Sequence, residues 1–344
     1  MAYAGSLDGQ WVYEDLREGG ALYLAPLSWM PGPRWLTTQS YAVTTWAVGP
    51  DPAAARAVSL AWHLLNGFLF WAVLRSIVTP RVAALAVGCF LLWPVQVESV
   101  AAVAYRSELV AASWLLLALL CSSHGWRLAA WICAAAAITG KEAGVIALVL
   151  VPLWAYWVGP RWSRAHLIGW IVATLAPVPF VLAWAGHWNF RLIASVDAMT
   201  QAIGAIGQLV IIGLWSAVDG SVLSIDHDWR GLGARQGVAV LGFAWTVYMV
   251  GTIWVRRALV WIAAALSLRI LTPSSELHEH HLYTAWLVVS LAVSHLVMEG
   301  VSCTSIKSIR ARCTEPMVAL ALWATTLRKP KPWPMAGVSS PLSI

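Results

Sequence analysis

The chain has 344 residues, of which 60% are hydrophobic and 11% charged, and its formal net charge is +6. An ordinary soluble domain carries roughly 25% charged residues, so this composition excludes that class of protein. The basic residues are spread between apolar runs, which favours a role in orienting the chain in a bilayer and gives no support to nucleic-acid binding.

Apolar runs long enough to cross a bilayer recur along the chain. They predict an all-α, polytopic membrane protein with about nine transmembrane helices, at roughly 54–74, 82–104, 108–123, 127–140, 142–158, 166–186, 236–255, 258–272 and 282–299. Residues 199–217 are predicted to be one re-entrant or interfacial helix, because the basic residues of the loops then fall on one side of the membrane. The predicted membrane domain covers residues 1–300, with a first external loop at about 1–53, and residues 301–344 form a basic C-terminal tail.

In this topology the acidic residues gather on the non-cytoplasmic face, and the first loop alone holds Asp8, Glu14, Asp15 and Glu18. External loops tolerate carboxylates, which accounts for the loop positions. It does not account for Glu98, because an ionisable side chain inside a predicted span is costly and is therefore a functional candidate.

The span at 54–74 carries Arg56, Ser59, His63 and Asn66 at spacings of three and four. Polar residues at this period line one stripe of a helix. In a membrane such a stripe faces protein or a water-filled cavity. Hydrogen bonding between helices and contact with a ligand are equally favoured by this pattern.

Arg106 and Glu108 lie at the outer mouth of the next predicted span, in which Pro94 is expected to kink the helix. Arg106 could pair with Glu98 or Glu108, or it could bind a phosphate. Lys141 joins two apolar runs on the outer side, against the positive-inside bias. That position favours a functional cation for an anionic ligand over an interface anchor.

Two later segments carry acidic and histidine side chains. Asp226 and Asp228 flank a histidine and could bind a divalent cation, although their spacing favours a solvated turn. The stretch "ELHEHHLY" at 276–283 lacks the His-Glu-x-x-His frame of zinc proteases. The chain also lacks a Walker loop, a dinucleotide glycine fingerprint and a nucleophile elbow with a triad, so ATPase, dehydrogenase and hydrolase functions have no support.

Taken in order, these segments resemble the GT-C membrane glycosyltransferases, especially the transmembrane and tetratricopeptide-repeat-containing O-mannosyltransferases and their bacterial relatives. The matching stretches cover roughly residues 8–300 and comprise "WVYEDL" with Glu14 and Asp15, "RWLTTQSY" at 34–41, Gly49, Asp51 and Pro52 with His63 and Asn66, Pro94 and Glu98 with Arg106 and Glu108, Lys141 with Glu142, and Glu279, His280, Leu282 and Tyr283. His280 stands where the family usually has Arg, and Trp93 stands where it usually has His.

The resemblance also predicts two defects in this chain. The family has a transmembrane helix before its acidic loop, so a shortened beginning is expected. After about residue 300 the sequence lacks the further span and the repeats of the family, and a reading-frame change near that point would explain the difference.

The resemblance implies an inverting transfer of a sugar from a polyprenyl-phosphate carrier to a hydroxyl of protein Ser/Thr or of a glycan. The reaction would take place on the extracytoplasmic face of a bacterial inner membrane or of the endoplasmic reticulum membrane. Asp15 is the expected general base, with Glu14 beside it. The implied substrate-binding residues are Arg106, Lys141, Glu98, Glu108, Glu142, His63, Glu279 and His280. No cofactor is implied, and a divalent cation at Asp226 and Asp228 is an open alternative.

The expected partners are therefore the lipid-linked donor, the acceptor and the bilayer, with no nucleic acid. Two other functions stay open from the sequence. Buried charges and a re-entrant helix also suit a polytopic transporter or lipid flippase, although the two halves of the chain show no similarity. A non-catalytic remnant of the glycosyltransferase family is the second alternative.

Overall fold

The computed structural model describes residues 34–93, 96–158, 163–175, 257, 260–261 and 283–302. These residues form helices, and the described part of the chain contains no strand. The predicted all-α class is confirmed for this part of the chain. The predicted re-entrant helix at 199–217 and the predicted span at 236–255 lie outside the described residues.

By its internal contacts the chain divides into two compact units, Met1–Met298 and Glu299–Ile344. The description of packing that follows concerns the first unit. The predicted basic tail at 301–344 stays a prediction, because only its first two residues are described.

Two helices lie where the chain leaves the predicted first external loop. α3 (Trp35–Val48) forms inside the predicted first external loop, so this part of the predicted loop is helical. α4 (Pro52–Leu74) follows after a short turn, and its 23 residues span about 34 Å. Its beginning is fixed by Asp51, whose carboxylate accepts a hydrogen bond from the Ala54 amide at 2.7 Å, and by a proline at the first helical position.

The predicted single span at 82–104 is broken in the structure. It consists of α5 (Pro80–Leu92), α6 (Gln96–Ala101) and the 3-10 turn η2 (Val103–Tyr105). Trp93 has extended backbone angles, φ −69° and ψ 129°, as steric conflict with a following proline demands. Pro94 also lacks the amide hydrogen that would continue the helix, so the interruption goes further than the predicted kink and separates α5 from α6.

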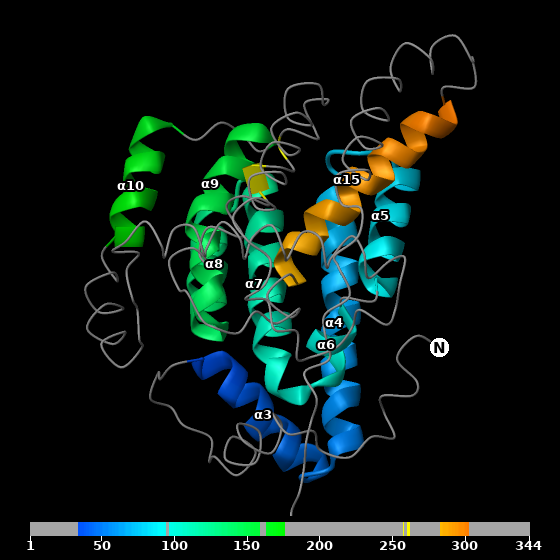
Figure 1. Cartoon of the computed structure of the whole chain (residues 1–344). Helices are drawn as coiled ribbons and strands as arrows, with labels where there is room; N and C mark the ends of the chain where they lie inside the picture. The colour runs from blue at the N-terminus through cyan, green and yellow to red at the C-terminus, as the bar shows by residue number, and fades with distance from the viewer. Residues whose placement is uncertain are drawn as a thin grey trace, which may run out of the picture. The chain divides into compact units, whose positions relative to one another are not determined.

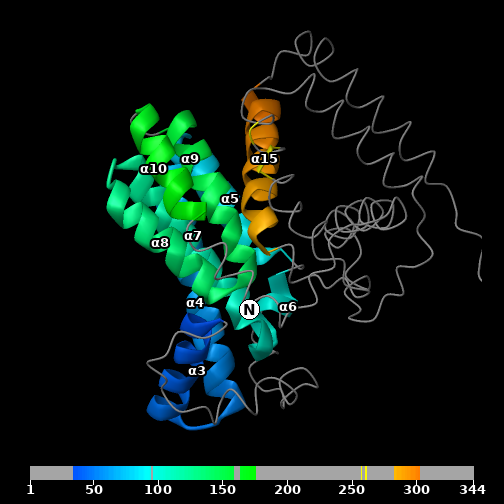
Figure 2. The same ribbon diagram turned by 90° about the vertical axis from the view of Figure 1, so that its left-hand side faces the viewer.

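The remaining helices are α7 (Arg106–Ser123), α8 (Arg127–Gly140), the 3-10 turn η3 (Glu142–Ile146), α9 (Ala147–Trp157), α10 (Arg164–Leu175) and α15 (Tyr283–Ser302). α7 packs against α4, α8 and α9, and it lies between α4 and α8 in Figure 1. α3 lies across the end of these helices at which α7 begins, as both views show (Figures 1 and 2).

Two helical stretches, Pro52–Leu74 and Val103–Ser123, are long and apolar enough to cross a membrane, judged by length and composition. Three shorter apolar helices cover Pro80–Leu92, Arg127–Gly140 and Ala143–Trp157. Two of the described helical stretches thus have the length and composition of a membrane span, and the number of crossings in the whole chain stays a prediction.

The turn from α8 into α9 depends on a close approach at Gly144. A Cβ atom at this position would lie 2.1 Å from the carbonyl oxygen of Ala137 in α8. Because that atom belongs to the helix backbone, it has little freedom to move away. The first residues of η3 can therefore return onto α8 only with glycine here.

The substitution Gly144→Ala is expected to separate η3 from α8. It should lower the free energy of unfolding by more than about 1 kcal/mol, which is the effect of a typical destabilising substitution. Gly88→Ala in α5 is the matched control, because a Cβ atom there meets nothing within 4 Å. Alanine in a helix interior should stabilise that helix by about 0.5–1 kcal/mol. Denaturant titration of the purified protein in detergent measures both, and equal effects at the two sites would contradict the close approach.

Candidate functional site

Buried charged side chains gather at one end of the helix bundle. Among the described residues, the buried Arg, Lys and Glu side chains are Arg56, Arg106, Glu108 and Lys141. They lie at the beginning of α4, at the beginning of α7 and immediately after α8. This polar end is also the end that α3 covers (Figure 1).

Arg106 is completely buried and binds two helices. Its Nε donates to Ser59 Oγ at 3.2 Å, and Nη2 donates to the Ala55 carbonyl at 2.8 Å, both on α4. Nη1 donates to Thr44 Oγ1 at 3.0 Å and to the Ser40 carbonyl at 3.3 Å, both on α3. The guanidinium that was predicted to bind substrate is thus surrounded by acceptors from α3 and α4 and holds these helices to α7.

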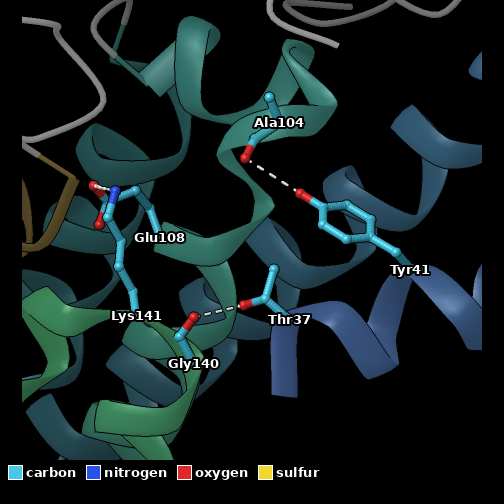
Figure 3. Close-up of polar contacts among 6 residues, drawn as sticks. All are labelled: Thr37, Tyr41, Ala104, Glu108, Gly140 and Lys141. Atoms are coloured by element: carbon cyan, nitrogen blue, oxygen red, sulfur yellow. Dashed lines mark hydrogen bonds and ion pairs between the residues drawn. The ribbon is translucent and has the colours of Figure 1, made fainter. Parts of the chain in front are cut away.

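Tyr41 completes the junction between α3 and the beginning of α7. Its hydroxyl donates to the carbonyl of Val103 at 2.6 Å. It also donates to the carbonyl of Ala104 at 3.2 Å (Figure 3). The guanidinium carbon of Arg106 lies 4.6 Å from the centre of its ring, within the range of a cation–π interaction. One aromatic side chain therefore satisfies the backbone of η2 and covers the buried charge beside it.

Lys141 and Glu108 form a buried ion pair. Lys141 Nζ lies 2.5 Å from Glu108 Oε1, and the two side chains are 4% and 3% exposed (Figure 3). Lys141 follows α8 in an extended conformation, and Glu108 lies in the first turn of α7. Next to this pair, Thr37 of α3 donates to the Gly140 carbonyl at 2.7 Å. The structure thus brings together two of the predicted substrate-binding residues, one from the first turn of α7 and one that directly follows α8.

His63 of α4 is linked to the beginning of α15. Its Nδ1 lies 2.7 Å from the hydroxyl of Tyr283, and its Nε2 lies 3.3 Å from the Leu91 carbonyl. Asn66 Nδ2 donates to the same hydroxyl at 3.1 Å. Since the Tyr283 oxygen accepts from Asn66, its hydrogen points to His63 Nδ1, which assigns the ring proton to Nε2, facing Leu91.

Asn66 extends this network to α7. Its Nδ2 also donates to the Leu109 carbonyl at 2.9 Å, and its Oδ1 accepts a 2.5 Å hydrogen bond from Ser113. Both ends of the amide are therefore occupied. Helices α4, α7 and α15 meet at this one side chain.

The polar stripe on α4 is thus used for contacts between helices. Arg56 Nε donates to the Ala101 carbonyl at 3.1 Å, Ser59 accepts from Arg106, and the two remaining stripe residues bind Tyr283. Of the two alternatives that the sequence left open, the described contacts favour hydrogen bonding between helices. A substrate-binding role of His63 stays a prediction.

Several predicted site residues lie outside the described part of the chain: Glu14, Asp15, Asp226, Asp228, Glu279 and His280. Glu98 and Glu142 belong to α6 and η3, and their side chains also lie outside what the structure describes. Within the described residues, no group of three or more His, Cys, Asp or Glu side chains is placed to hold a metal ion.

The sequence did not identify the roles of Thr37, Tyr41 and Thr44. All three are buried on one face of α3 and form hydrogen bonds to other elements. Their spacing of four and three residues is the signal that was available, because it is typical of one helix face. This spacing was not interpreted as a helix because residues 1–53 were expected to form a loop.

Comparisons with protein-family models, with curated proteins and with solved structures found no match for this chain.

Replacement of Lys141 by Met should destabilise the fold by about 3–5 kcal/mol, because it removes one partner of a buried ion pair. Replacement of both residues, Lys141→Met with Glu108→Leu, should recover at least half of that loss. The free energies of unfolding of the two single variants and the double variant form a double-mutant cycle. Additive losses would show that the two side chains do not interact.

Tyr283→Phe should destabilise the protein by about 1–3 kcal/mol, since it keeps the ring and removes the hydroxyl that serves both His63 and Asn66. Tyr156→Phe is the matched control, because Tyr156 is 78% exposed. That control should stay within about 0.5 kcal/mol of the parent. The same loss in both variants would show that the hydroxyl of Tyr283 has no special role.

Proposed function

We propose that this chain is a membrane glycosyltransferase of the GT-C type, which transfers a sugar from a polyprenyl-phosphate carrier to a hydroxyl acceptor. The supporting observation is that motif segments far apart in the sequence come together in the fold. His63 and Tyr283, 220 residues apart in sequence, hydrogen-bond to each other, and so do Thr37 and Gly140, 103 residues apart. Each of these residues lies in or directly beside a stretch that resembles the family. The residues of each pair are far apart in the sequence, and it is the fold that brings them into contact.

The exposed surface of the helices supports a membrane location. α4 exposes Leu64, Leu65 and Phe68 in its middle and second half. α3 shows an inverted polarity, since hydroxyl-bearing side chains face inward while Val43 and Trp46 are exposed. An apolar outer face with polar groups satisfied inside is typical of a helix in contact with lipid. We propose the full arrangement of about nine crossings and one re-entrant helix on this basis.

The proposed chemistry divides the work between a base and a cation. An acceptor hydroxyl is a weak nucleophile until a carboxylate removes its proton, and Asp15 is our candidate for that base. The leaving group is a phosphate that already carries negative charge, so it needs electrostatic stabilisation rather than a proton. We assign this role to Lys141, with Glu108 fixing the position of its ammonium group.

Arg106 has a different role in this proposal. Its guanidinium donates to acceptors on α3 and α4, so it is a positioning residue that holds these helices at the beginning of α7. The expectation that it binds the donor phosphate directly is not part of the proposed mechanism.

The distribution of buried charge favours an enzyme over a transporter. Transporters place their binding groups near the middle of the membrane. Among the described residues, the buried Arg, Lys and Glu side chains all lie at helix ends. Charge at one end of a bundle suits a reaction at a membrane surface.

The proposal is tested with membranes that contain the expressed chain and with labelled polyprenyl-phosphate sugars. Appearance of label in a protein or glycan product, at the expense of the lipid, is the expected result. Absence of transfer from every carrier tested, with the protein folded and inserted, would contradict the proposed function.

Asp15→Asn should abolish transfer, because the amide cannot accept the proton of the acceptor hydroxyl. We expect a loss of at least 100-fold in turnover, on the order of the usual contribution of a general base. Asp51→Asn is the matched control, since Asn caps a helix as well as Asp does and α4 should be unaffected. Near-normal turnover of the Asp15 variant would remove this residue from the mechanism.

A further inference from the structure

Two polar side chains of α6 are buried without hydrogen-bond partners. Gln96 and Ser99 are 0% exposed, and both polar atoms of the Gln96 amide and the Ser99 hydroxyl have no partner in the structure. The two residues are three positions apart, so they share one face of the helix. Buried polar groups of this kind cost free energy and are rare in folded proteins unless something outside the chain satisfies them.

The contacts on either side place this pair along the polar stripe of α4. Before it in sequence, the Leu91 carbonyl lies 3.3 Å from His63 Nε2. After it, the Ala101 carbonyl accepts from Arg56 Nε at 3.1 Å. These two contacts follow one another in the direction opposite to α4, and α6 packs on α4 between them (Figures 1 and 2).

The chemistry of the pair selects a class of ligand. An amide offers both donors and an acceptor, and a hydroxyl offers one donor and two acceptor sites. A phosphate could satisfy the donors but would leave the Gln96 carbonyl oxygen without a hydrogen. Neighbouring hydroxyl groups of a neutral ligand both donate and accept, so they satisfy all the unpartnered atoms.

We infer that Gln96 and Ser99 form a binding site for hydroxyl groups of the transferred sugar. The inference rests on the proposed function, because the polyprenyl-phosphate donor supplies the sugar. It adds two uncharged residues to the site and gives them a role in sugar specificity. Neither residue takes part in the chemical step.

The test uses the double variant Gln96→Met with Ser99→Ala. Methionine keeps the length of the side chain and removes its hydrogen-bonding groups. Ser122→Ala is the matched control, because Ser122 is also 0% exposed with an unpartnered hydroxyl but lies in the last turn of α7, at the opposite end of that helix. In the absence of ligand, both variants should be at least as stable as the parent, since each loses an unsatisfied buried group.

Ligand binding is measured as the shift of the unfolding midpoint in detergent with three probes. These are polyprenyl-phosphate-mannose, polyprenyl-phosphate-glucose and polyprenyl phosphate without sugar. At least one sugar carrier should protect the parent chain and the Ser122 variant more than the bare lipid does. That additional protection should disappear in the double variant, and its apparent KM for the donor should rise at least about tenfold with little change in kcat, as the loss of two or more hydrogen bonds predicts.

Four results would overturn the inference. One is a ligand-free double variant that is less stable than the parent, because the two side chains would then have partners within the chain. A second is unchanged protection of the double variant by the sugar carriers while the parent transfers sugar; this would refute the sugar site and leave the proposed function intact. A third is equal protection of the parent by the bare lipid and both sugar carriers. Failure of all three probes to protect the parent, together with absence of transfer, would contradict the proposed function as well.

Discussion

The side chains of Arg106 and Glu108 carry opposite charges into the interior within the first turn of α7. Residues two positions apart point to different sides of a helix. Arg106 therefore meets α3 and α4, whereas Glu108 meets Lys141 after α8. Because a buried charge without a partner costs several kcal/mol, these contacts determine where three other elements can lie around α7.

The opposite end of the bundle imposes much weaker constraints. There α4 and α7 present Phe70, Leu74, Leu116 and Leu119 to one another and to neighbouring helices, in a largely apolar core. Such contacts stabilise by close packing but are not directional, and lipid chains are as apolar as leucine. The register of the helices is thus set mainly at the polar end, and the apolar end follows from it.

The polar end contains groups of two kinds. Arg106 donates to α3 and α4, and Tyr41 donates to the Val103 carbonyl of η2, so these two side chains maintain the architecture. Gln96 and Ser99 have no such partners in the structure. A ligand-binding site needs both kinds, because the satisfied groups keep the surrounding helices in place and the unsatisfied groups can form hydrogen bonds to a ligand.

Much of the helical structure could be predicted from local sequence. The predicted spans at 54–74, 108–123 and 127–140 coincide closely with α4, α7 and α8, because their apolar runs have the length and period of single helices. Pro94 indicated that the helix would be disturbed near Trp93. The sequence did not indicate whether the helix would be kinked or divided into α5 and α6, because both begin with the same missing hydrogen bond. The helix at Trp35–Val48 was overlooked because its inward face carries hydroxyl groups in place of apolar ones.

The sequence by itself determined that this is an apolar, helical chain with a few polar residues at helical spacing, since composition and periodicity are local properties. Only the tertiary structure decided what those residues touch. The contact of His63 with Tyr283 crosses 220 positions, and that of Lys141 with Glu108 crosses 33. No local pattern encodes such a pairing, because it arises when several helices satisfy their buried polar groups at the same time.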